Sequence, residues 1–205
     1  MSEGTTIDPA LQAMIERLVD ERVAAKIGGL EAQVEEALAR LVKVEEAAVG
    51  QKASLLVFSG DLDRLMSAFI IANGAVAMGL EVSMYFTFWG LVALKRGGAS
   101  FAGKTVEEKM MAAILPRSPA VVPTSRLNML GMGPKIFKRM MGQRHVENLP
   151  DLIALARELG VKMIACQMSM GVMGIHKDEL IEGIEFGGVA TYLEAAAESR
   201  VTLFL

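Results

Sequence analysis

From Ala53 to the end of the chain, short apolar runs alternate with segments of helical pattern. Four runs are rich in strand-forming residues, namely "ASLLVFS" (53–59), "EVSMYFTF" (81–88), "VKMIA" (161–165) and "VTLFL" (201–205), and a fifth short strand is expected near "IEF" (184–186). Helical periods lie between them, in "DRLMSAFIIANGAVAMG" (63–79) and "LPDLIALARELG" (149–160), and we also expect a helix to begin with "WGLVALKRGG" (89–98) and a short one over "HKDELIEG" (176–183). This alternation predicts an α/β fold with parallel strands joined by crossover helices.

The first part of the chain has a different character. Residues 8–48 are rich in Ala, Glu, Leu, Arg and Lys and are expected to be helical. From Ile27, just before Gly28 and Gly29, apolar residues recur with a 3-4 spacing, at Ile27, Leu30, Val34, Ala37, Leu41, Val44 and Ala48. Such a stripe is typical of a coiled-coil seam, whose partner is either another copy or the chain's own domain. We therefore expect a helical extension over 1–50 and an α/β domain over 51–205.

The composition of the chain argues against several classes of function. A chain of 205 residues suits one domain with an appendage, and a net charge of −3 offers no basic footprint for nucleic acid. One cysteine and two histidines supply no Cys/His metal spacing, so we expect no metal and a free thiol suited to a reducing cytoplasm. The segment "MSEGTTIDPALQAM" lacks the regions of a signal peptide, which also favours a cytoplasmic location.

Two segments raise the question of a membrane. The stretch Leu65–Leu94 carries Glu81 as its only charge, but Gly79 and Glu81 interrupt it, so a buried helix followed by a strand fits better than a spanning helix. The irregular segment Leu115–Asn148 contains a basic amphipathic helix over 134–141, with Ile136, Phe137, Met140 and Met141 on one side. That helix is either a lid over the sheet edge or a contact for a membrane surface or partner.

The only cysteine, Cys166, directly follows the predicted strand 161–165, in "IACQMSMGVMGI". Reacting groups of parallel sheets gather at the carboxyl ends of strands, where helix N-termini favour a thiolate over a thiol. Met168, Ser169, Met170 and Met173 would give a soft, apolar lining with one hydroxyl, suited to a sulfane sulfur. The alternative is a cysteine buried as a small apolar side chain.

Other strand ends supply further candidates for the same edge. Ser59 and Asp61 follow the first strand, and Asp61 is expected to cap the next helix. Thr87 and Trp89 end the second strand, where Trp89 either walls a pocket or belongs to the core. His176 lies ten residues after Cys166 and is a candidate base, or else a residue that caps a short helix.

The combination of "SGDLDRLMSAFIIANGAVAMGLEVSMYFTFWGL" with "ACQMSMGVMGI" resembles the DsrE-like family of sulfur-transfer proteins, in particular its stand-alone branch with one cysteine. The resemblance covers residues 53–205. It implies a three-layer α/β/α domain with a parallel sheet of five strands. Met168, Ser169, Met170, Met173 and Gly174 match the family's cysteine loop, and an acidic residue is common where Gly171 stands.

The resemblance also implies a function. We expect a sulfur carrier or sulfurtransferase that holds sulfane sulfur as a persulfide on Cys166 and passes it to a partner thiol, without a cofactor. Because the chain has no second cysteine, the acceptor must be another protein or a small thiol. Family members commonly form oligomers, and some are membrane-associated. The alternative function is a non-catalytic assembly or peripheral membrane protein with a structural cysteine.

Overall fold

The computed structural model describes residues 8–48, 51–98, 101, 103–126 and 132–205, and the chain divides into two compact units, Met1–Ala48 and Val49–Leu205. The first unit contains helix α1, Pro9–Ala48, built from strong helix formers. Asp8 caps its start, since the Asp8 Oδ1 accepts a hydrogen bond from Ala10 N at 3.0 Å, and Pro9 follows in the first helical turn, where its missing N–H costs nothing.

The second unit alternates strands and helices. Its strands are β1 (Lys52–Val57), β2 (Glu81–Phe86), β3 (Lys162–Cys166), β4 (Glu185–Gly187) and β5 (Val201–Phe204). Its α-helices are α2 (Leu62–Ala77), α3 (Val106–Ile114), α4 (Met132–Gln143), α5 (Leu149–Glu158), α6 (Gln167–Met173) and α7 (Val189–Ala197). Three short 3-10 helices, η1 (Phe88–Leu94), η2 (Pro119–Val121) and η4 (Lys177–Glu179), complete the described elements.

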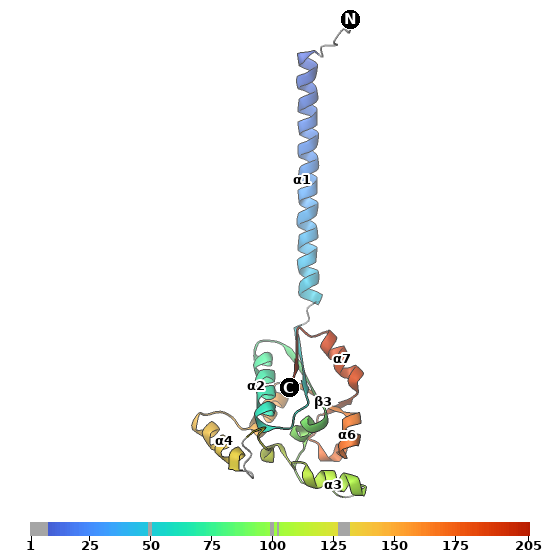
Figure 1. Cartoon of the computed structure of the whole chain (residues 1–205). Coiled ribbons are helices and arrows are strands. Elements are labelled where there is room, and N and C mark those ends of the chain that lie inside the picture. Colours follow the sequence, from blue (N-terminus) through green and yellow to red (C-terminus); the bar gives the residue numbers. More distant parts are fainter. Residues whose placement is uncertain (1–7, 49–50, 99–100, 102, 127–131) are drawn as a thin grey trace. The chain divides into compact units, whose positions relative to one another are not determined.

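The five strands form one parallel sheet in the order β4-β3-β2-β1-β5. Side chains alternate between its faces. One face, with residues such as Leu55, Met84 and Met163, belongs to the main core together with α2 and α5. The opposite face carries Tyr85, Ile164 and Cys166, against which Tyr192 of α7 packs. Helices therefore cover both faces, and the expected three-layer α/β/α fold is confirmed (Figure 1).

Three local elements differ from expectation. The segment after β2, expected to begin an α-helix at Trp89, forms the 3-10 helix η1, because Gly90 N is held to Phe58 O at 2.9 Å. Helix α3 was not expected, although Thr105 and Glu108 form a capping box at its start. The short helix expected at 176–183 is reduced to the 3-10 turn η4.

The two segments with a membrane signature form parts of the α/β unit. Leu65–Leu94 is divided among α2, β2 and η1, as expected, and no helix among the described residues is long and apolar enough to cross a bilayer. The amphipathic helix expected over 134–141 is α4, but Met141 is only 8% exposed and belongs to the main core. The exposed apolar side chains of α4 therefore include Ile136, Phe137 and Met140 but not Met141.

Candidate functional site

Cys166 is the last residue of β3 and the residue before α6, so the thiol lies at the carboxyl edge of the sheet as the sequence predicts. Its exposed fraction is 4%, and it packs with Tyr85 and Ile164 on the face that carries α7. The register of β2 and β3 pairs Phe86 with Ala165. The next residue on each strand side, Thr87 and Cys166 respectively, therefore lies at the same carboxyl edge of the sheet.

Hydroxyl groups surround the buried thiol. Thr87 Oγ1 and Ser169 Oγ lie 2.7 Å apart, and both side chains are buried. Tyr85 lies in β2 two residues before Thr87, and its hydroxyl oxygen is 3.5 Å from the carbonyl oxygen of Gly187, the residue paired with Cys166 across β3 and β4. Tyr85 of β2, Thr87 just beyond that strand and Ser169 of α6 thus place three hydroxyls near the thiol.

These hydroxyls control the ionisation of the thiol. Burial raises the pKa of Cys166, but hydrogen bonding from the Ser169 and Tyr85 hydroxyls outweighs it, with smaller contributions from the Ser169 backbone and Thr87, so that the pKa lies below its ordinary value. Burial, and then the interaction with the Cys166 sulfur, raises the pKa of Tyr85, so that its hydroxyl stays protonated. The site therefore favours the thiolate more than the surroundings of a free cysteine do.

Sequence reasoning predicted Thr87 and Ser169 but missed Tyr85. The signal that could have found it is the strand period of two, because Tyr85 and Thr87 must share a face if both belong to a regular strand. The methionines are arranged differently from the expected lining. Met168 is 61% exposed, whereas Met170 and Met173 are buried in the main core.

The remaining predicted residues of the sheet edge form a separate pocket. Ser59, Asp61 and Trp89 line a cavity of about 410 Å³ together with residues such as Arg64 and Pro123, and Cys166 does not line it. Asp61 precedes α2 as expected, but its carboxylate makes no capping hydrogen bond and instead accepts one from Ser59 Oγ at 3.1 Å. Trp89 is 46% exposed and walls this cavity.

His176 and Gly174 contact a buried ionic cluster beyond the end of α6 through their backbone atoms. The carboxylate of Glu179 lies 2.5 Å from Lys104 Nζ and 4.0 Å from Lys95 Nζ, and it also accepts a hydrogen bond from His176 N at 2.9 Å. Lys104 Nζ donates to Gly174 O at 2.7 Å. The His176 ring faces α3, with Nε2 3.8 Å from Glu108 Oε1. The cluster therefore fixes the loop that follows the cysteine helix.

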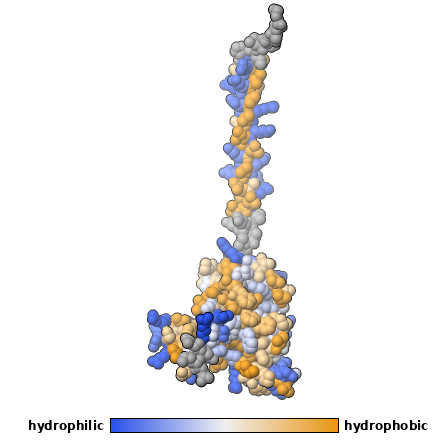
Figure 2. Space-filling model, in the orientation of Figure 1, coloured by the Kyte–Doolittle hydropathy of each residue, from blue (hydrophilic) through white to orange (hydrophobic). Residues whose placement is uncertain are grey.

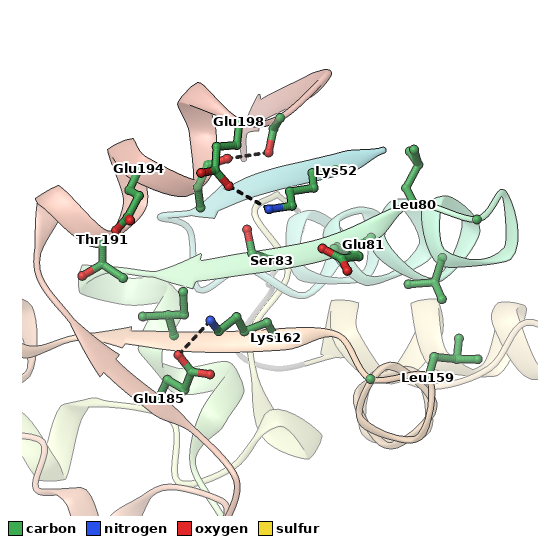
Figure 3. Close-up of a pocket in the computed structure, with 17 residues that line it drawn as sticks. Lys52, Leu80, Glu81, Ser83, Leu159, Lys162, Glu185, Thr191, Glu194 and Glu198 are labelled. Carbon is green, nitrogen blue, oxygen red and sulfur yellow. Dashed lines mark hydrogen bonds and ion pairs between the residues drawn. The ribbon is translucent and has the colours of Figure 1, made fainter. Parts of the chain in front are cut away.

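A larger cavity of about 910 Å³ lies beneath α7 at the opposite end of the strands (Figure 3). Both lysines in its wall are already paired, Lys52 with Glu198 at 2.7 Å and Lys162 with Glu185 at 3.3 Å. Its lining includes residues of α7 and the first residues of β1, β2 and β3, whereas Cys166, the last residue of β3, does not line it. Among the described residues, no three His, Cys, Asp or Glu side chains are grouped to hold a metal ion.

The second unit is an α/β/α domain with a cysteine at the carboxyl edge of its parallel sheet. Comparison with known families identifies the class of protein to which such a domain belongs. The sequence model of the DsrE/DsrF/DrsH-like family matches residues 50–204, and the chain belongs to this family. The match includes the whole of the cysteine site and leaves α1 outside.

The chain is also similar to individual proteins of known name. The chain is 42% identical over 155 residues to the uncharacterized protein YrkE of Bacillus subtilis, and 33% identical over 156 residues to the sulfur carrier protein DsrE2 of Allochromatium vinosum. Each match covers 76% of this chain, with 97% and 98% of the respective relative. The crystal structure of YchN from E. coli matches 75% of this chain and 99% of its own, with 12% identity and a TM-score of 0.44. Membership of the family and the sulfur carrier among these relatives support a role in sulfur relay.

Proposed function

We propose that this protein is a sulfur carrier that holds sulfane sulfur as a persulfide on Cys166 and passes it to an acceptor thiol. The observation that carries the proposal is the placement of the Tyr85, Thr87 and Ser169 hydroxyls beside a buried thiol, where hydrogen bonding offsets the effect of burial and holds the pKa of Cys166 below its ordinary value. A structural cysteine has no need of such donors, whereas a nucleophile reacts as its thiolate.

The transfer needs no net oxidation. The Cys166 thiolate attacks the terminal sulfur of a donor persulfide, a new S–S bond forms, and the old S–S bond breaks with its electron pair leaving on the donor thiolate. An acceptor thiolate then attacks the terminal sulfur of Cys166–S–SH and regenerates the Cys166 thiolate. Because Cys166 is the only cysteine, the acceptor is another protein or a small thiol. Such an exchange suits a reducing compartment, and we place the carrier in the cytoplasm as part of this proposal.

Replacing Tyr85 by phenylalanine tests the role of the hydroxyls. A hydrogen bond to a charged group is worth about 1.5–3 kcal/mol, so its loss should raise the pKa of Cys166 by roughly one to two units. The midpoint of the alkylation rate against pH should move up accordingly, and the rate at neutral pH should fall about tenfold or more. The rate is measured with iodoacetamide on the native protein across a pH series.

Tyr192→Phe is the matched control for this experiment. The Tyr192 ring lies 5.6 Å from the Tyr85 ring, between centroids, in the same cluster, but its hydroxyl is not among the groups that act on Cys166. The control should keep the wild-type midpoint. Equal midpoints for Tyr85→Phe and the wild type would show that the hydroxyl does not tune the thiol.

A second candidate function rests on the exposed fraction of 4% at Cys166. In that case the cysteine is a packing residue, and the chain is a non-catalytic assembly protein. The same alkylation series separates the two functions. Labelling of the native protein with a pH midpoint below that of a free cysteine supports the carrier, and protection until the protein is denatured supports the assembly protein.

A further inference from the structure

Within its own unit, helix α1 carries a long face of exposed apolar side chains. All twelve large apolar side chains between Leu11 and Val42 that belong to this face or border it are between 49% and 62% exposed. Figure 2 shows hydrophobic surface running along α1, with hydrophilic residues beside it. A face of this length marks an interaction surface, since contiguous apolar surface is rarely left to water.

The comparisons place this helix outside the machinery shared with the relatives. The family model begins at residue 50, and the aligned regions already account for 97% and 98% of the two relatives. Almost no chain is left in either relative to supply a counterpart of α1. The role of α1 is therefore additional to the sulfur-relay role shown for the family, and it does not depend on the chemistry of Cys166.

The spacing of the apolar residues selects the kind of partner. Val23, Ile27, Leu30, Val34, Ala37 and Leu41 follow an alternating 4-3 spacing. In heptad terms Ile27, Val34 and Leu41 occupy a positions, while Val23, Leu30 and Ala37 occupy d positions. Ile27 and Val34 at a and Leu30 at d match the combination of β-branched a residues and leucine d residues that favours two parallel helices, whereas Leu41 at a and Val23 and Ala37 at d do not. Before Val23 the apolar residues recur every four positions, at Leu11, Ile15 and Val19, a spacing that leaves the heptad seam.

The charges that flank the seam agree with a parallel pair. Lys26 occupies a g position and Glu31 the e position of the next heptad, so a parallel partner brings Lys26 of one helix to Glu31 of the other. An antiparallel pair would set g against g and bring Lys26 near Arg40, two like charges. Gly28 and Gly29 fall at b and c positions, away from the seam, and have nothing within 4 Å of the place of a Cβ.

We propose that α1 pairs with α1 of a second copy of this chain, as a parallel, in-register coiled coil over Val23–Leu41. The pairing would carry two α/β units in one assembly, and so gives the homo-oligomer expected from the sequence a specific interface.

Sedimentation equilibrium of the full chain tests the pairing. The double variant Leu30→Glu with Val34→Glu places two charges in the seam, and we expect it to lose the self-association of the wild type. The matched control, Ala32→Glu with Ala39→Glu, adds the same charges at f positions on the opposite side of α1 and should keep the wild-type mass. A monomeric wild type, or equal masses for all three proteins, would overturn the proposal, with α1 then covered by its own chain or by another protein.

The orientation is tested by cross-linking in a Cys166→Ser background, which does not rely on a charged variant folding normally. A chain with Val23→Cys should form a disulfide with its own copy under mild oxidation. In a mixture of Val23→Cys and Leu41→Cys chains, the two variants should cross-link to each other no more often than chains that collide at random, because a parallel pair keeps residues 23 and 41 at opposite ends of the seam. The reverse result would show an antiparallel pair and overturn the proposal.

Exchanging the charges of Lys26 and Glu31 tests the parallel pairing independently, through the dissociation constant of the dimer. Lys26→Glu should raise the dissociation constant roughly three- to tenfold, and adding Glu31→Lys should restore it. Residues five apart on one helix do not meet, so restoration reports a contact between helices. Failure of the second change to restore association would exclude the parallel g-to-e pairing.

Discussion

Replacing Glu179 by glutamine is expected to destabilise the α/β unit by about 3–5 kcal/mol, because it leaves two buried ammonium groups without their carboxylate. The side chains of Lys95, Lys104 and Glu179 are at most 4% exposed, and Glu179 lies against both lysines. A neutral amide keeps the shape but not the charge. The melting temperature should fall by roughly 10 °C, as measured by calorimetry or circular dichroism.

Two other variants show whether the loss of stability comes from the unpaired buried charges. Glu198→Gln breaks the Lys52 ion pair at 2.7 Å, but both side chains are exposed, so the melting temperature should stay close to that of the wild type. Lys95→Met removes the surplus buried cation and leaves Lys104 paired one to one with Glu179. It should be neutral or stabilising. A loss of stability for Lys95→Met as large as that for Glu179→Gln would show that the cluster is not held by its carboxylate in this way.

Replacing Gly90 by alanine is expected to cost about 3 kcal/mol or more, because the added Cβ would lie 2.2 Å from Val57 O. The atom it meets is backbone of β1, which cannot rotate away as a side chain can. Gly90 N also donates to Phe58 O at 2.9 Å and Thr87 O at 3.0 Å, so relief of the clash moves the segment that holds Thr87. Urea unfolding measures the change in stability.

Gly74→Ala is the control for this substitution. Gly74 lies inside α2, and nothing lies within 4 Å of the place of its Cβ. The substitution should therefore stabilise the protein by up to about 1 kcal/mol through helix propensity. A wild-type stability for Gly90→Ala would show that β1 and η1 can separate without cost, and that their close contact does not impose the 3-10 helix in place of an α-helix.

The parallel sheet and its layers could be predicted because each strand from Ala53 onward is an apolar run separated from the next by a helical period. Even the three-residue strand at Glu185–Gly187 was expected from "IEF". The 3-10 helix η1 could not be predicted, since the contact of Gly90 with the end of β1 is not visible in the local sequence. Helix α3 was missed although its capping box is a sequence signal.

The candidate site was predicted only in part, for a reason of geometry. The sequence shows which residues follow strand ends, and Ser59, Asp61, Thr87, Trp89 and Cys166 all do lie near that edge. It does not show to which face of the sheet each residue beyond a strand turns. Thr87 therefore joins Cys166 and Ser169, while Ser59, Asp61 and Trp89 line a different cavity. Roles for these residues in sulfur transfer stay predictions.

The proposed persulfide on Cys166 is tested most directly by the intact mass of the reduced protein after incubation with a polysulfide. The wild type should gain the mass of whole sulfur atoms, lose it again on treatment with a reductant, and transfer it to an added small thiol. Cys166→Ser should gain nothing. A native wild-type protein that gains no sulfur, or a Cys166→Ser variant that gains as much as the wild type, would contradict the carrier function.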